Sequence, residues 1–211
     1  MDLRNNLLGN FKSLFMVVYW KYLLIGLGLV SSACSAQEPV TNSSKASVVK
    51  PFFQASHVQP YHVSIGAVLF DQSGRIACHH FKEILGHKDV YILMRESVEN
   101  GEAPLMTLHR GLKEEFGAVA EPVAFLGCLS GYLPDPRLSF EKTTLYIACK
   151  LVHWNPETRD LEDPEASSVI EWLEPSVLIS LMQKQGIRFH HRVDADESEI
   201  IRRALPYISN L

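Results

Sequence analysis

Apolar and polar positions alternate in a way that divides the chain into short strands and amphipathic helices. Residues 62–70 form a β-rich apolar run that ends in the turn sequence Asp71-Gln-Ser-Gly-Arg75, and a second apolar run continues to Cys78. Two such runs on either side of a glycine-containing turn are typical of a β-hairpin. We therefore expect a hairpin here, followed by a further extended segment at Val90–Met94.

A helix is predicted from Pro104 to about Phe116. Its leucines recur at spacings of three and four: Leu105, Leu108 and Leu112. This spacing gives the segment one apolar face. Proline suits the first turn of a helix, and glycine, here Gly117, is the usual residue just after the last turn. Both ends of the helix are therefore indicated by the sequence.

The second half of the chain predicts further strands and two amphipathic helices. Strands are expected at 122–132, 142–152 and 168–172, and helices at 175–183 and 195–207. A helix that follows the early strands, with more strands and a terminal helix after it, predicts an α/β or α+β sandwich.

The first 36 residues have the order of a secretory signal peptide. Basic residues precede the apolar run 22–30, and small residues follow it around Cys34. A positive flank, an apolar stretch and small residues are typical of export signals. Cys34 also resembles a bacterial lipoprotein processing site, although Ser31 stands where a larger aliphatic residue is usual. An uncleaved membrane anchor is the alternative, and a start at Met16 would leave a shorter and more conventional signal.

This pattern sets the expected domain organisation. Residues 1–36 would be a signal peptide or membrane anchor, residues 37–57 a flexible linker, and residues 58–211 the folded domain. We expect the protein to be exported or attached to a membrane through its N-terminal segment, as a periplasmic protein or a lipoprotein. A cytoplasmic domain behind an anchor is the alternative.

Composition narrows the classes of partner. The chain has 211 residues, and its net charge of -4 gives no basic footprint for nucleic acid, so no nucleic-acid partner is expected. None of the four cysteines forms a CxxC pair, so a zinc site has little support. Three cysteines lie in apolar runs and are expected to be buried free thiols, with a disulfide left open for an exported domain: Cys78, Cys128 and Cys149.

The helix at 104–116 carries the residues with the clearest chemistry. Arg110 and Glu114 are four residues apart and can pair on one face. Glu114 and Glu115, with a third carboxylate from elsewhere, can form an oxygen-rich site of the kind that Mg²⁺ or Mn²⁺ binds. Such an ion polarises a phosphoryl oxygen and lowers the pKa of attacking water. By itself, however, a Glu-Glu pair on a helix is usually solvated surface charge.

Around these residues the chain resembles the Nudix family. That family's signature is Gly, five residues, Glu, seven residues, Arg-Glu-aliphatic, one residue, Glu-Glu, one residue, Gly-aliphatic. The positions that match in register are Glu102, Arg110, Leu112, Glu114, Glu115 and Gly117. The segment 99–102 is similar to the Glu-x-Gly-Glu that opens the motif. Residues 63–75 resemble the family's first hairpin, and residues 170–172 its late strand ending in Trp.

The resemblance implies a Nudix-like α/β/α sandwich with a mixed sheet. It also implies an Mg²⁺- or Mn²⁺-dependent hydrolase that cleaves the pyrophosphate linkage of a small nucleoside diphosphate derivative. Glu114 and Glu115 would bind the metal, Arg110 would orient Glu114 or a neighbouring acid, and Glu102 would support the loop or add a ligand, so that Arg110, Glu115 and Glu102 form the expected catalytic group. A distal acid often completes the site in this family. The candidates are Glu141, Glu162, Asp163 and Glu165, of which Glu165 is favoured because similar acids precede the Trp-bearing strand in relatives.

Two departures from the signature leave the activity open. Gly111 stands where the family has a second acid after the Arg, and Met94-Arg95-Glu96 stands where it has Pro-Gly-Gly; Ala118 is also a small stand-in for the usual aliphatic. The site could work with fewer helix ligands, or Glu96 or His109 could supply the missing group from a shifted position. In the third interpretation hydrolysis is lost, and the chain is a catalytically silent domain that binds nucleotides or another protein.

Other polar clusters are expected to be structural. Adjacent histidines point in different directions, so the doublets His79-His80 and His190-His191 are predicted to be exposed or in loops. The acidic stretch 194–199 is expected to cap the helix that follows it. Three aromatic residues are expected in the core or a cleft wall rather than stacked on a base: Tyr132, Phe140 and Tyr146.

Overall fold

The computed structural model describes residues 61–209, apart from residues 85, 134–139 and 190–194. The expected signal or anchor segment at 1–36, the linker at 37–57 and the His190-His191 doublet lie outside the described residues. Within the described ranges, no helix is both long and apolar enough to span a membrane.

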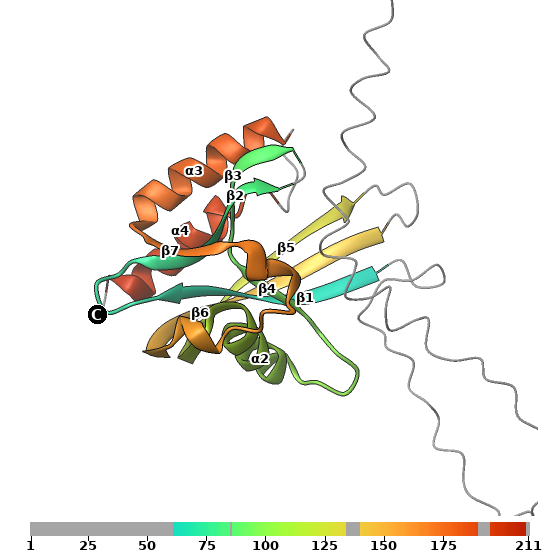
Figure 1. The fold of residues 1–211 in the computed structure, drawn as a ribbon, viewed down its shortest axis with the longest axis vertical. Helices are drawn as coiled ribbons and strands as arrows, with labels where there is room; N and C mark the ends of the chain where they lie inside the picture. The colour runs from blue at the N-terminus through green and yellow to red at the C-terminus, as the bar shows by residue number, and fades with distance from the viewer. Residues whose placement is uncertain (1–60, 85, 134–139, 190–194, 210–211) are drawn as a thin grey trace, which may run out of the picture.

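Strands and helices follow one another in the order that the sequence predicts, with one additional short strand and two 3-10 helices. In chain order the elements are β1 (Tyr61–Phe70), β2 (Ile76–Ile84), β3 (His87–Ile92), β4 (Met94–Ser97), α2 (Pro104–Phe116), β5 (Ala118–Leu133), β6 (Phe140–Trp154), the 3-10 helices η2 (Pro156–Thr158) and η3 (Pro164–Ser167), β7 (Val169–Leu173), α3 (Pro175–Arg188) and α4 (Ser198–Ile208). Helix α2 lies on one face of the sheet, and α3 and α4 lie on the other (Figure 1).

The strands form one mixed sheet with the order β3-β2-β1-β6-β5. β1 runs parallel to β6, whereas it pairs with β2 in the antiparallel direction beside the turn, at Phe70↔Ile76. Farther from this turn, residues 64–67 of β1 pair with β4 instead of β2. β2 itself pairs with β3 and β7. β4 therefore lies where β2 has left β1, directly against α2.

The core consists of two apolar layers separated by β1. Successive side chains of a strand point to opposite faces, so Ile65, Ala67 and Leu69 pack toward α2, whereas Val68 and Phe70 pack toward α3 and α4. All five are 0% exposed, so burial on both faces accounts for the nearly continuous apolar run of β1. The predicted α/β/α sandwich with a mixed sheet is confirmed.

Helix α2 begins and ends where the sequence predicts. Gly117 adopts a left-handed conformation with φ 63° and ψ 32°, and its N–H bonds to carbonyls of the last turn. Leu108 and Leu112 are fully buried, whereas Leu105, in the first turn of the helix, is 50% exposed. Elsewhere the bounds shift, since Val90–Met94 divides between β3 and β4, and α4 begins at Ser198 rather than 195.

Three expectations about single side chains are wrong, and the capping expected of 194–199 is found at Asp196 but not at Glu197. His79 is fully buried, because β2 is flanked by β3 and β7 and its His79 ring packs against Phe116 of α2. Cys128 is exposed, and Tyr132 is 65% exposed, because both lie on β5 at the edge of the sheet. Asp196 accepts a hydrogen bond from the N–H of Ser198 as a cap does, but Glu197 is buried and accepts from the N–H of Leu93 and the hydroxyl of Tyr146.

Candidate metal centre

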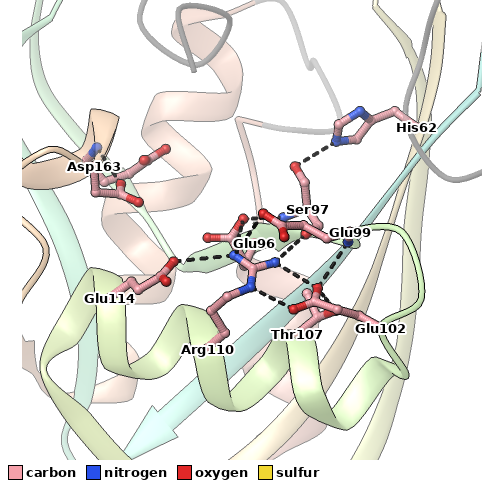
Figure 2. A network of polar contacts seen from close by, with 10 residues as sticks. His62, Glu96, Ser97, Glu99, Glu102, Thr107, Arg110, Glu114 and Asp163 are labelled. Carbon is pink, nitrogen blue, oxygen red and sulfur yellow. Dashed lines mark hydrogen bonds and ion pairs between the residues drawn. The ribbon is translucent and has the colours of Figure 1, made fainter. Parts of the chain in front are cut away.

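Three carboxylates from three separate elements converge beside α2. Glu114 comes from the helix, Glu96 from β4 and Asp163 from the N-terminal end of η3, and one oxygen of each lies within 4.8 Å of the others. Glu96 and Asp163 are buried, and Glu114 is partly exposed. We refer to Glu96, Glu114 and Asp163 as the acidic cluster; Figure 2 shows Asp163 across a gap from the other two.

Arg110 lies between the acidic cluster and the loop before α2 (Figure 2). Its Nε and Nη2 atoms donate to the two carboxylate oxygens of Glu102, each at 2.8 Å, and Nη2 also donates to the carbonyl of Ser97. Its Nη1 lies 3.2 Å from Glu96 and 3.3 Å from Glu114. The two-point contact with Glu102 fixes the guanidinium plane, and the remaining nitrogen then holds two like charges side by side.

Glu102 lies on the far side of Arg110 from the acidic cluster and organises the loop. Besides Arg110, its carboxylate accepts from the hydroxyl of Thr107 at 2.8 Å and from the N–H of Glu99 at 3.0 Å. Hydrogen bonding to Arg110 lowers the pKa of Glu102 to about 2. Of the two roles predicted for Glu102, these contacts correspond to support of the loop.

Glu115 is buried and is not one of the three carboxylates of the acidic cluster. Nε2 of His79 lies 2.8 Å from its carboxylate, and the backbone N–H of Arg95 also bonds to it. Burial, followed by the negative charges of Glu165, Glu96 and Asp163, raises the pKa of Glu115 well above its usual value. Several acids that raise one another's pKa in this way form a region where a cation would be stabilised.

His79 holds Glu115 through a buried chain of hydrogen bonds. Its Nδ1 lies 2.7 Å from the hydroxyl of Ser168. Burial lowers the pKa of His79 to about 3, so the ring is neutral and carries one N–H. Because the Ser168 hydroxyl can donate to Nδ1, Nε2–H is left to donate to Glu115.

The loop around η3 places two of the four predicted distal acids near the site. Asp163 joins the acidic cluster, and its carboxylate also accepts from the N–H of Glu165 at 2.9 Å. Burial and contact with Asp163 raise the pKa of Glu165, which lies at the edge of the same group of charges. Glu141 and Glu162 are exposed and lie outside the acidic cluster. The Asp-Pro step at 163–164 is typical of the start of a helix, but it does not identify Asp163 as a member of the acidic cluster.

Arg159 was missed by the sequence analysis because no motif surrounds it. Its Nε donates to the carbonyl of Glu115 at 2.5 Å, Nη1 to the carbonyl of Ser168 at 3.1 Å and Nη2 to the carbonyl of Glu165 at 3.0 Å. One side chain thus ties the loop that carries Asp163 to the C-terminal end of α2, where a positive charge is also favourable.

The residues present fit a hard divalent cation. The acidic cluster offers carboxylate oxygens alone, which are the ligands that Mg²⁺ and Mn²⁺ prefer. Gly111 faces Glu96 so closely that a Cβ added at Gly111 would lie 2.6 Å from the Cβ of Glu96. Of the two residues considered for the missing helix acid, Glu96 therefore lies over Gly111, whereas His109 is exposed on the helix.

Comparison with known proteins places this geometry in a family context. A family model described as "NUDIX domain" matches residues 60–194 of the 211. No curated protein matches the chain. Among solved structures, a NUDIX hydrolase from Nitrosomonas europaea is similar in fold, with 14% sequence identity, a TM-score of 0.50, and coverage of 69% of this chain and 88% of that chain.

Proposed function

The chain belongs to the Nudix family, and from this premise we propose that it is an Mg²⁺- or Mn²⁺-dependent hydrolase of the pyrophosphate linkage in a nucleoside diphosphate derivative. Nudix domains generally hydrolyse derivatives of nucleoside diphosphates. For this chain we propose which metal is used, which residues bind it, and that hydrolysis is retained. The observation that carries it is the acidic cluster, in which three oxygens lie within 4.8 Å of one another.

Glu96, Glu114 and Asp163 would hold the cation. A divalent ion bound there would neutralise charge on the diphosphate and lower the pKa of water. Arg110 keeps Glu96 and Glu114 together against their mutual repulsion, and Glu102 keeps Arg110 in place. Glu115, held by His79, is not a member of the acidic cluster.

The test is release of phosphate or nucleotide by the full chain, purified in detergent, across a panel of nucleoside diphosphate derivatives with Mg²⁺ or Mn²⁺. Glu114→Gln keeps the size of the side chain but removes one charged ligand. We expect its rate to fall about 100-fold or more, since even groups that only support metal ligands contribute up to about that much. Glu199→Gln, on the 54% exposed Glu199 side chain of α4, is the matched control and should keep the wild-type rate.

The two outcomes separate the hydrolase from a domain that only binds. Metal-dependent turnover that is lost in Glu114→Gln and kept in Glu199→Gln supports the proposal. A folded protein that binds nucleotide but releases no product from any compound of the panel would overturn it.

A further inference from the structure

We infer that a carboxylate and a glycine have exchanged positions in this chain. Glu96 of β4 supplies the metal-binding carboxylate that an acid at position 111 would otherwise supply, and Gly111 leaves the space for the Glu96 side chain. The inference rests on the proposed function in one respect, namely that the acidic cluster binds a divalent cation.

Gly111 is required by proximity and not by backbone conformation. It lies inside α2 without the left-handed backbone angles that favour glycine at Gly117. A Cβ at position 111 would lie 2.6 Å from the Cβ and 3.2 Å from the Cγ of Glu96, and 2.9 Å from the Sδ of Met94. Side-chain carbons do not approach so closely, and glycine is otherwise unfavourable inside a helix. The glycine is therefore explained by the strand that crosses over it.

Glu96 reaches the same side of the helix that an acid at position 111 would reach. Its side chain is buried over Gly111, and its carboxylate lies 3.2 Å from Nη1 of Arg110, the residue just before Gly111. The carboxylate also accepts from the N–H of Ser97 at 2.8 Å, which fixes its direction. In this position it joins Glu114, three residues after Gly111, in the acidic cluster. A residue and the one three positions later share one face of a helix.

The two departures from the family signature are complementary. The signature has an acid where this chain has Gly111, and glycine where this chain has Glu96. These two positions lie on consecutive elements and face each other directly across the contact between α2 and β4. One carboxylate and one glycine are therefore present in both arrangements, with their positions exchanged.

The exchange is tested with a double-mutant cycle on the full chain. The variants are Glu96→Gly, Gly111→Glu and the two combined, with Glu96→Gln as a variant that keeps the size of the side chain. The readouts are Mn²⁺ affinity, from the loss of the free-ion paramagnetic resonance signal, and the midpoint of thermal unfolding without metal.

We expect both single changes at position 96 to weaken Mn²⁺ binding about 10-fold or more, because one charged ligand is lost. Gly111→Glu alone should lower the unfolding midpoint, because it forces overlap with Glu96 and adds a like charge. The combined variant should bind Mn²⁺ within about 3-fold of wild type and unfold near the wild-type midpoint, since the energies of contacting residues are not additive.

A second comparison keeps the test decisive if Gly111→Glu alone does not fold. Gly111→Ala should lower the unfolding midpoint in the wild-type background but much less in the Glu96→Gly background, where the closest contact is gone. Unchanged Mn²⁺ affinity in Glu96→Gln, or a combined variant that binds no better than Glu96→Gly, would overturn the inference.

Failure of the inference and failure of the proposed function give different results. Coupled effects on Mn²⁺ affinity without turnover of any substrate would support the exchange and contradict the hydrolase. Metal-dependent turnover that is unchanged in Glu96→Gln would support the hydrolase and contradict the exchange.

Discussion

The ion pair between Arg110 and Glu96 joins α2 to β4 at the acidic site. Arg110 faces Glu102 on one side, and Glu96 and Glu114 on the other. The acidic cluster has three carboxylates, those of Glu96, Glu114 and Asp163, and the guanidinium of Arg110 pairs with only the first two. A bound divalent cation would balance the excess negative charge, so the electrostatics and the proposed metal binding agree.

A buried neutral histidine is expected to make stability depend on pH. Nε2 of His62 lies 3.1 Å from the hydroxyl of Ser97, and burial, together with Lys142, lowers the pKa of His62 from 6.5 to about 3. As the pH falls below 6.5, the unfolded chain therefore takes up a proton that the folded chain excludes. Stability that is fully present above this pH is lost toward pH 3, by about 1.4 kcal/mol per pH unit from this group.

We expect the free energy of unfolding to depend less steeply on pH in His62→Gln than in the wild-type protein. Urea unfolding between pH 7 and pH 4 measures it, and the variant should lose less stability over this range than wild type. Some dependence should remain, because the pKa of His79 is also lowered to about 3. Equal slopes for variant and wild type would show that His62 is protonated in the folded protein.

Sequence spacing was informative for residues within one helix and less so for those that meet across loops. Arg110 and Glu114 were paired from their spacing of four, and their atoms lie 3.3 Å apart. Glu115 was paired with Glu114 as a metal ligand, but the turn of the helix directs it to His79. The choice between Asp163 and Glu165 depended on the path of η3, which no local pattern in the sequence determines.

At the scale of elements, β4 does most to shape the site. Its four residues include Arg95 and Glu96, so neither alternation nor an apolar run marked it as a strand. β4 forms because β2 leaves β1 and exposes backbone groups of residues 64–67, which β4 then pairs. By contrast, both ends of α2 could be predicted, since Pro104 and Gly117 act locally.

The loop that carries Asp163 is expected to depend on Arg159. Arg159→Leu removes the three donors that reach the carbonyls of Glu115, Glu165 and Ser168. We expect Mn²⁺ affinity to fall about 10-fold, as is typical when a group that supports metal ligands is lost. Isothermal titration with Mn²⁺ measures the change.

Arg188→Leu is the matched control, because Arg188 also donates to backbone carbonyls, those of Lys88 and Asp89. It should keep wild-type Mn²⁺ affinity. If Arg159→Leu binds Mn²⁺ as tightly as this control, η3 is held in place without Arg159.

At the scale of the whole molecule, the arrangement in layers was predictable and the sheet order was not. The apolar run 62–70 predicted a strand, the leucine spacing of 104–116 predicted a helix with one apolar face, and the succession of elements predicted a sandwich. The parallel pairing of β1 with β6 joins residues about 80 positions apart, such as Tyr61 and Glu141, and no local signal specifies such a pair.

We propose that residues 1–36 direct the folded domain out of the cytoplasm. Expressed in a bacterium with two membranes, the full chain should fractionate with membranes and become sensitive to protease when the outer membrane is permeabilised. The physical reason is the charged, then apolar, then small-residue order of this segment.

Cys34→Ser distinguishes a lipid anchor at Cys34 from an uncleaved membrane anchor. Release of the variant into the soluble periplasmic fraction would indicate lipidation at Cys34. A chain that stays protected from protease until the inner membrane is lysed would contradict export and favour a cytoplasmic domain behind an anchor.

The close approach of α2 to β4 also limits the order in which this sequence could have arisen. Glutamate at position 96 would have collided with any side chain still present at position 111, because the two Cβ positions are only 2.6 Å apart. Glycine at 111, by contrast, removes a carboxylate without any overlap. The route without overlap between these two side chains is therefore the one in which glycine at 111 precedes glutamate at 96.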